Sequence, residues 1–346
     1  MNLNLFSDCA FENNILYFYS ALYGFVGKWD IFGDNRMKYH DLLDEPHNFI
    51  RTVANHEKLY SLESSGKALY IFDVSSNKHD VLSIPYNTYE YGNFMDLLLY
   101  GNEILIFPRY QSEIMILDTV SGKNRIMQYD AEILNTWHCG CRHKNFYYMF
   151  PEKGGYTLGI DLYNYHVHKI EIDEVRDGFI HSVSYGEAIF LLTGKGKIYS
   201  LDTINMVMSE LYDFELSDPA GQIVVTSHRI IVLPRYQRHD IYVWDTDTRK
   251  SYVYSEYPRD FCYQAAEVWN AYEGMTDIGD YYLYAMRSTN YALMINKISG
   301  EIQWKRPRNI DGQFMCIMAG RGENQFYESE ENYRLIDYIG YVTASD

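Results

Sequence analysis

The chain carries little positive charge for its length. Its 346 residues include 30 Lys and Arg against 47 Asp and Glu, so the formal net charge is −17. A protein that binds nucleic acid needs a basic surface to displace counterions from phosphates. An anionic membrane surface likewise attracts basic segments. The charge balance therefore excludes nucleic acid and membranes from the expected partners.

Cysteines and long apolar runs are also scarce. An odd, sparse set of cysteines does not indicate a disulfide framework. No apolar run approaches the roughly 20 residues that span a bilayer. The first residues lack the basic region and apolar core of a signal peptide. These absences predict a cytoplasmic protein. The cysteines are Cys9, Cys139, Cys141, Cys262 and Cys316.

Helical periodicity and the common catalytic motifs are missing as well. No segment repeats apolar residues at helical spacing over 12 residues. There is no Gly-x-Ser-x-Gly elbow, no phosphate-binding Gly-x-x-x-x-Gly-Lys loop and no His-Glu-x-x-His pair. The run WHCGCRH at 137–143 places two cysteines on one face of a strand. Without a second cysteine pair, we expect them to be buried thiols rather than metal ligands.

What is present is a repeat. ILIFPRYQSEIMILDTVSGKNRI begins at Ile104, and IIVLPRYQRHDIYVWDTDTRKSYV begins at Ile230. Each contains an apolar strand, a PRYQ loop, a second strand that ends in Asp, a polar turn and a further strand. Following that Asp gives a register with spacings of 41 to 51 residues. Its members are Asp30, Asp73, Asp118, Asp161, Asp202, Asp245, Asn296 and Asp337.

Each unit has the pattern of four short strands. The third unit shows them at 94–100, 103–109, 112–118 and 123–129, with turn residues between β-branched, aromatic or leucine-rich runs. Four-strand units of about 40–45 residues are typical of β-propeller blades. The chain resembles the β-propeller superfamily over its full length. The resemblance lies in the period of the repeat, because the paired glycines of kelch repeats and the Gly-His of WD40 repeats are absent. The resemblance implies an all-β chain with a single propeller domain.

The register divides the chain into eight units, which predicts eight four-stranded blades. Seven blades plus an irregular extra segment is the alternative, because the chain after Asp337 is short. We expect the repeated Asp to be structural, since Asp at a turn accepts hydrogen bonds from nearby backbone N–H groups. The units span 1–43, 44–88, 89–131, 132–173, 174–215, 216–258, 259–308 (with an inserted loop at 257–274) and 309–346.

A second register marks the start of the first strands: an aromatic residue, any residue, then usually a polar residue. The resemblance implies that first strands run along a central channel. Strand alternation places the first and third residues on one face, unless a bulge at the start of the strand separates them. The third residues would then point into the channel mouth. They are Asp8, Arg51, Asp96, His138, His181, Gln222 and Cys316.

This ring allows two interpretations. In the first, His138 and His181 act as acid and base beside Asp96, and Arg51 anchors a substrate carboxylate. The same two histidines with Asp96 could instead bind a divalent metal, the one cofactor that the sequence suggests. In the second interpretation, the residues form a solvated polar ring around a water-filled channel.

The PRYQ loops supply a second candidate site. The resemblance implies that these loops lie on the same face of the propeller as the starts of the first strands. An Arg-Tyr pair on a rigid loop suits a carboxylate or an aromatic ring. The alternative is that each arginine pairs with neighbouring acids. The candidate residues are Arg109 and Tyr110, Arg235 and Tyr236, and Arg287 at a similar place in the seventh unit.

The inserted loop at 257–274 is the longest departure from the repeat. Long loops on a rigid scaffold often carry binding residues. Trp269 and its aromatic neighbours, which include Tyr257 and Phe261, predict either an aromatic lid over the channel or a packing role over the channel mouth.

Together these features favour a peptide- or protein-binding module that uses a channel face rich in aromatic residues and arginine. Asp8 and Gln222 are further predicted binding residues on this face. A small polar ligand is a further candidate partner. The alternative is a lyase or hydrolase with the His138, His181, Asp96 and Arg51 site at the channel mouth. Propellers host both kinds of function, so the fold does not decide between them.

Overall fold

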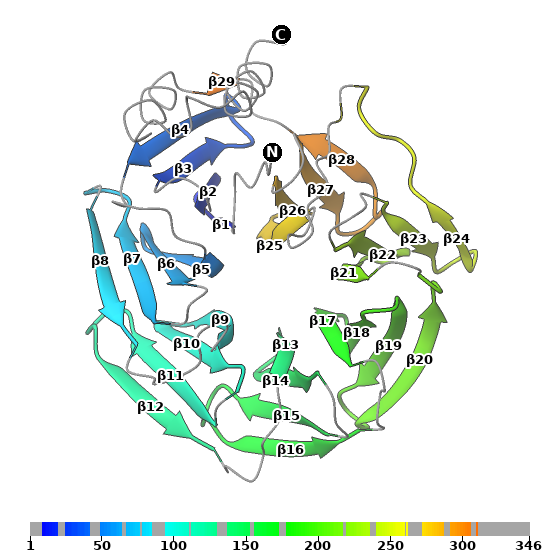
Figure 1. Cartoon of the computed structure of the whole chain (residues 1–346), viewed down its shortest axis with the longest axis horizontal. Helices are drawn as coiled ribbons and strands as arrows, with labels where there is room; N and C mark the ends of the chain where they lie inside the picture. The colour runs from blue at the N-terminus through cyan, green and yellow to red at the C-terminus, as the bar shows by residue number, and fades with distance from the viewer. Residues whose placement is uncertain are drawn as a thin grey trace, which may run out of the picture.

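The computed structural model describes most of the repeat region, and its β-strands form the architecture in Figure 1. The described residues are 9–19, 25–41, 49–63, 67–76, 78–84, 94–110, 112–129, 137–152, 156–172, 178–216, 219–235, 240–259, 261, 272–286, 291–305 and 309–310.

Seven sheets, each built on four antiparallel strands, surround a central axis as the blades of a propeller (Figure 1). Blade 1 contains β1 (Cys9–Glu12), β2 (Ile15–Tyr19), β3 (Phe25–Asp30) and β4 (Arg36–Asp41). Blade 2 contains β5 (Phe49–Asn55), β6 (Lys58–Glu63), β7 (Ala68–Asp73) and β8 (Lys78–Ser83). Blade 3 contains β9 (Phe94–Tyr100), β10 (Glu103–Pro108), β11 (Glu113–Asp118) and β12 (Asn124–Gln128). Blade 4 contains β13 (Trp137–His143), β14 (Phe146–Pro151), β15 (Tyr156–Asp161) and β16 (Val167–Glu171).

The remaining blades follow the same order from the axis outward. Blade 5 contains β17 (Phe179–Tyr185), β18 (Ala188–Thr193), β19 (Lys197–Asp202) and β20 (Val207–Asp213). Blade 6 contains β21 (Ala220–Val225), β22 (Arg229–Pro234), β23 (Tyr242–Asp245) and β24 (Lys250–Val253). Blade 7 contains β25 (Tyr272–Ile278), β26 (Tyr281–Met286), β27 (Ala292–Asn296) and β28 (Ile302–Lys305). The first strand of each blade lies nearest the axis (Figure 1).

The ring closes with seven blades, so the prediction of eight is wrong and its seven-blade alternative holds. The inner strands β25 and β1 are direct neighbours: Thr276 Oγ1 donates to the carbonyl of Cys9 at 2.9 Å, and Cys9 Sγ contacts the carbonyl of Gly274 at 3.3 Å. No blade fits between them. A short strand after blade 7, β29 (Asn309–Ile310), instead pairs in parallel with β4 at the outer edge of blade 1. Asp337 and the rest of the eighth unit lie outside the described residues.

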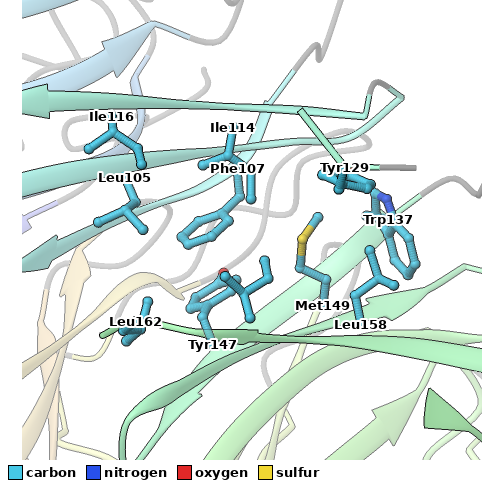
Figure 2. Packing of buried hydrophobic residues seen from close by; sticks show 11 residues of the cluster. Leu105, Phe107, Ile114, Ile116, Tyr129, Trp137, Tyr147, Met149, Leu158 and Leu162 are labelled. Atoms are coloured by element: carbon cyan, nitrogen blue, oxygen red, sulfur yellow. The ribbon is translucent and has the colours of Figure 1, made fainter. Parts of the chain in front are cut away.

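The hydrophobic core lies between neighbouring blades. Between blades 3 and 4, Leu105 and Phe107 of β10 face Tyr147 and Met149 of β14 (Figure 2). The rings of Phe107 and Tyr147 stack with centroids 3.7 Å apart. Alternation produces this arrangement, because each blade is a twisted sheet that buries both faces against its neighbours. The fourth strands face outward, and β8 is almost entirely exposed.

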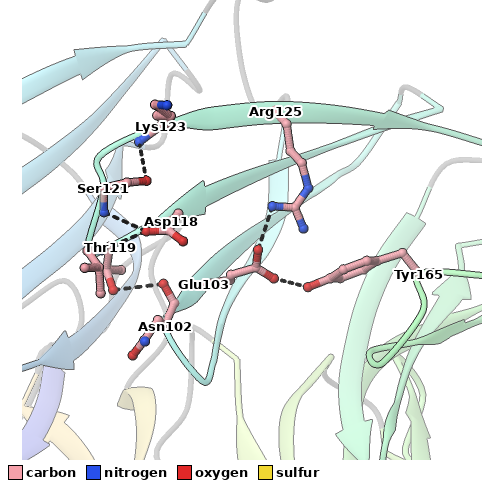
Figure 3. A network of polar contacts seen from close by, with 9 residues as sticks. Asn102, Glu103, Asp118, Thr119, Ser121, Lys123, Arg125 and Tyr165 are labelled. Carbon is pink, nitrogen blue, oxygen red and sulfur yellow. Dashed lines mark hydrogen bonds and ion pairs between the residues drawn. The ribbon is translucent and has the colours of Figure 1, made fainter.

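The repeated Asp is structural, as predicted. It ends the third strand of each blade and caps the turn that follows. Asp118, for example, accepts hydrogen bonds from the N–H groups of Val120 at 3.0 Å and Ser121 at 2.7 Å. Figure 3 shows this turn beside a second contact between blades, in which Glu103 accepts hydrogen bonds from Arg125 and Tyr165. In blade 7 the amide oxygen of Asn296 takes the same role toward Ile298 and Ser299.

This turn leads to a stability prediction at Asp73, whose pKa is lowered from 3.8 to about 2 by hydrogen bonds from Ser76 and Ser75. Because the folded pKa is the lower one, the carboxylate stabilises the fold fully above pH 4 and loses this effect as the pH falls toward 2. We expect Asp73→Ala to lower the melting temperature at pH 7. Asp73→Asn should largely preserve it, as Asn296 does in blade 7, and should flatten the melting curve's dependence on pH between 4 and 2. Circular-dichroism melts test this, and an Asp73→Ala protein as stable as wild type would refute it.

Candidate functional site

The first strands begin with a β-bulge, which sets the geometry of the channel mouth. In blade 5, Phe179 pairs with Thr193 and His181 pairs with Leu192, so Ile180 is the extra residue. The same irregularity recurs in blades 2, 3, 4 and 6. A bulge inserts one residue and reverses the alternation of the residues that follow it. The bulge residues are Ile50, Met95, His138, Ile180 and Gly221.

Because of this bulge, the aromatic and the third residue face opposite sides of the blade. Phe179 packs in a cluster with Tyr148 and Phe150 of the preceding blade. His181, by contrast, accepts a hydrogen bond from the backbone N–H of Ile223 in the following blade. Of the two possibilities that the sequence left open, the bulge that separates the two residues is the one observed.

The register also needs a correction in blade 4. Trp137 pairs with Pro151 and holds the aromatic position, so the third residue of this blade is Cys139. His138 occupies the bulge, one position closer to the start of the strand. The imidazole therefore lies at a different level from the side chains of Arg51 and His181, which hold true third positions.

A cavity of about 800 Å³ occupies the channel. Of the predicted ring, Arg51, Asp96, His138, His181 and Gln222 line it. Asp8 and Cys316 lie outside the described residues.

Asp96 is bound on both of its carboxylate oxygens. Arg51 Nε donates to Oδ1 at 2.7 Å, and the backbone N–H of Leu97 donates to the same atom at 2.8 Å. The hydroxyl of Tyr147 donates to Oδ2 at 2.6 Å. Asp96 is only 8% exposed. These bonds join blades 2, 3 and 4, so Asp96 connects neighbouring blades.

The two histidines have opposite tautomers. His138 Nδ1 lies 3.0 Å from the carbonyl of Phe179, so it must donate its proton there and Nε2 carries the lone pair. His181 Nδ1 accepts from Ile223 N–H at 3.3 Å, so its proton is on Nε2. Burial lowers the pKa of both rings, and repulsion from Arg51 adds to this effect at His181, whose pKa falls to about 4. Both imidazoles are neutral at pH 7.

No group of three or more His, Cys, Asp and Glu side chains in the described part of the chain has an arrangement that could hold a metal ion. The predicted set of His138, His181 and Asp96 is therefore not assembled. Cys139 and Cys141 belong to the apolar contact between blades 4 and 5. Burial raises the pKa of both thiols, to about 12 for Cys141, so they remain protonated, as expected of buried thiols.

Arg109 is not among the residues that line the cavity, but it lies beside His138, which does line it. Its backbone carbonyl accepts a hydrogen bond from the N–H of Trp137 at 2.9 Å, so the β10–β11 loop reaches the start of β13. Its guanidinium carbon is 5.4 Å from the centre of the Tyr110 ring. Arg235 holds the corresponding loop position in blade 6, where its N–H donates to the carbonyl of Pro219. The positive charges of both arginines contribute to the lowered pKa of His138.

The other predicted rim residues, Tyr236, Arg287 and Trp269, lie outside the described residues. The beginning of the inserted loop packs on the periphery. Tyr257 and Phe261 contact Trp304 of the outer strand β28, with ring centroids 5.4 and 5.1 Å away. These two residues therefore pack at the outer edge of blade 7, and neither a lid nor packing over the channel mouth is observed for them.

Sequence reasoning missed Tyr147 and the bulge residues other than His138. Tyr147 looks like any core aromatic in the run FYYMF, and only the fold reveals that its hydroxyl reaches Asp96. The bulge residues hold the middle position of the register, between the aromatic and the third residue. The repeat pattern shows that this position exists but does not indicate that its residue is left unpaired.

Comparison with known proteins supports the fold alone. No family model matches the chain, and no curated protein matches it. Among solved structures, virginiamycin B lyase from Staphylococcus aureus, crystallised in a catalytically inactive form with quinupristin, has a TM-score of 0.61 at 11% identity over 84% of this chain and 96% of that chain. A chain of the mitotic checkpoint complex has a TM-score of 0.58 at 9% identity, covering 83% and 85%.

A third similar structure is PorZ of the type-IX secretion system from Porphyromonas gingivalis, with a TM-score of 0.57 at 12% identity. The match covers 88% of this chain and 38% of that chain. The fold and these comparisons identify the chain as a β-propeller. Within the described residues, no helix is long and apolar enough to cross a membrane.

Proposed function

We propose that this propeller is a binding module that holds a peptide or protein at its channel mouth through a carboxylate group of the partner. The observation that carries this proposal is the unpaired guanidinium of Arg109. It forms no hydrogen bond or ion pair with any described residue, and its Nε atom is buried. A buried donor without a partner costs about 1–3 kcal/mol. A ligand carboxylate would remove that cost through paired N–H···O bonds.

The surroundings of Arg109 support an anionic group at this place. In a chain with a net charge of −17, arginines usually find a carboxylate nearby, as Arg125 does with Glu103. Arg109 forms no ion pair with any described residue, although it is less exposed than Arg125. Arg235 adds a second positive charge near the same histidine. Among the described residues, Glu152 is the one carboxylate that acts on the same histidine, so two arginines face one acid there.

The residues deeper in the channel favour binding over catalysis. Arg51 and Asp96 bond to each other, and Asp96 is also bound by Tyr147. His181 is held by the backbone of the next blade. Each of these side chains ties one blade to another, which is a structural role.

A second candidate function, a lyase or hydrolase, is favoured by one observation. His138 donates from Nδ1 to Phe179, so the lone pair of Nε2 is available at the mouth as a general base. In that case Arg109 would hold the substrate carboxylate while Nε2 accepts a proton from the substrate. His138→Ala would then abolish turnover, whereas under the binding proposal it would only weaken the ligand.

A reducing compartment such as the cytoplasm agrees with the cysteines. Cys9, Cys139 and Cys141 carry thiols rather than disulfides. Disulfides are rare where glutathione keeps thiols reduced.

The proposal predicts a preference for carboxylates that depends on Arg109. Saturation-transfer NMR titrations with N-acetylglycine and with its amide test it. We expect wild type to bind the acid about tenfold more tightly than the amide, or better, because hydrogen bonds to charged groups are worth about 1.5–3 kcal/mol. Arg109→Gln should abolish this preference.

The matched control is Arg125→Gln, which removes the same charge from an exposed arginine of β12. It should keep the preference for the acid. Equal binding of acid and amide by the wild-type protein would overturn the proposal, and so would an equal loss in the two variants.

A further inference from the structure

The bulges build an apolar collar around the channel mouth. The residues Ile50, Met95 and Ile180, together with His138, line the cavity from blades 2, 3, 5 and 4. We call these four residues the collar. All are partly exposed. Three of the four are large and apolar, and the imidazole of His138 is the one polar group among them. The polar ring that the sequence predicts lies deeper.

Arg109 lies beside the collar on blade 4, where its carbonyl accepts a hydrogen bond from the N–H of Trp137, the residue before His138. On blade 3, β9 and β10 are antiparallel, so Arg109 and Met95 lie on opposite sides of the pair that Pro108 forms with Phe94. A ligand group held by Arg109 would therefore lie next to His138 and above Met95.

We infer that the mouth recognises the C-terminal residue of a peptide that ends in a large apolar side chain. The terminal carboxylate pairs with Arg109, and the side chain packs on Met95 and Ile180. The backbone N–H of the same residue donates to Nε2 of His138. This nitrogen carries the lone pair because Nδ1 holds the proton that it donates to Phe179. This inference rests on the proposed function, because it uses the same carboxylate contact.

A C-terminal residue fits these three features better than an internal Asp or Glu. Only at a C-terminus do a carboxylate, an apolar side chain and an N–H donor belong to one residue. The charge of the molecule adds a further condition. With a net charge of −17, the surface repels strongly acidic peptides, so the residues before the terminus should be neutral or basic.

Three tetramethylrhodamine-labelled pentapeptides with a neutral Gly-Ser leader test the inference by fluorescence anisotropy. One ends in leucine with a free carboxylate, one ends in leucine amide, and one ends in alanine with a free carboxylate. We expect the leucine acid to bind about tenfold more tightly than the amide. The alanine acid should also bind about tenfold more weakly, because it leaves the apolar collar without a partner.

Two collar variants and two matched controls locate the effect. Met95→Ser and Ile180→Ser should each reduce the preference for leucine over alanine by about threefold or more, and should keep the preference for acid over amide. Met127→Ser and Ile170→Ser change similar, partly buried residues on the outer strands β12 and β16. These controls should keep both preferences. Thermal melts confirm that each variant is folded.

The outcomes separate the inference from the proposed function. If leucine and alanine acids bind equally while the amide fails, the carboxylate site stands and the collar inference is overturned. If leucine acid and amide bind equally, the carboxylate contact is refuted, and the inference falls with it. If no pentapeptide binds while N-acetylglycine does, the inference is overturned and the proposed function survives. Loss of leucine preference in the control variants would also overturn it.

Discussion

Replacing Asp96 with alanine is expected to lower the free energy of unfolding by about 2–4 kcal/mol. The substitution removes hydrogen bonds to two side chains, Arg51 and Tyr147, and leaves a guanidinium without its carboxylate. Breaking one partner out of a buried ion pair costs about 3–5 kcal/mol. The expected range is lower because the Arg51 side chain is 34% exposed, so water screens part of its charge. Urea unfolding followed by fluorescence measures the change.

Tyr147→Phe provides the matched partial deletion. It removes the hydroxyl that donates to Asp96 and keeps the ring that stacks on Phe107. We expect a loss of about 1–2 kcal/mol. The double variant with Asp96→Ala should lose less than the sum of the two, since both changes break the same hydrogen bond. If Asp96→Ala leaves stability unchanged and removes an activity instead, Asp96 belongs to a catalytic site and the connecting role is refuted.

The propeller could be predicted from the sequence because its signal is local and repeated. Asp73, Asp118 and Asp202 each end a strand and accept hydrogen bonds from the backbone two or three residues later. Such a turn depends only on neighbours in the chain, so its period appears directly in the sequence. The number of blades does not depend on neighbours. It depends on the contact of Thr276 with Cys9, which lie 267 residues apart.

The channel was harder to predict because a bulge changes the facing of every residue after it. The pattern aromatic, any residue, polar correctly selected Arg51, Asp96 and His181 as cavity-lining residues. It could not show that these side chains reach toward the next blade. It also placed His138 among them, because the bulge position and the third position are only one residue apart in the sequence.

The rim arginine was predicted from its repeated loop, but its lack of a partner was not. PRYQ occurs twice, which drew attention to Arg109 and Arg235. Whether an arginine pairs with an acid depends on which blade edge faces it, and that is a property of the assembled ring. The structure shows that Arg109 has no ion pair with any described residue, which is the feature that supports ligand binding.

The backbone that supports the mouth has a particular weak point at Gly178. This residue precedes Phe179, whose carbonyl holds His138, and it adopts a φ of +63°. A Cβ atom built there would lie 1.7 Å from the carbonyl oxygen of Glu152. Both the contact and the conformation involve backbone, which cannot move aside as a flexible side chain can. We therefore expect Gly178→Ala to reduce the free energy of unfolding by about 3–5 kcal/mol, combining left-handed strain with overpacking.

Gly186→Ala separates these two causes. Gly186 lies in the β17–β18 turn of blade 5 with a φ of +60°, and a Cβ there has no atom within 4 Å. It should lose only about 1 kcal/mol, the cost of the conformation. The Gly178→Ala protein that remains folded at low temperature should also bind the leucine-ended peptide more weakly, because a displaced Phe179 carbonyl no longer fixes the tautomer and position of His138. Equal stability losses in the two variants would show that the carbonyl of Glu152 does not limit the space at Gly178. Unchanged peptide affinity of the Gly178→Ala protein would show that the bond from His138 to Phe179 is not needed for ligand binding.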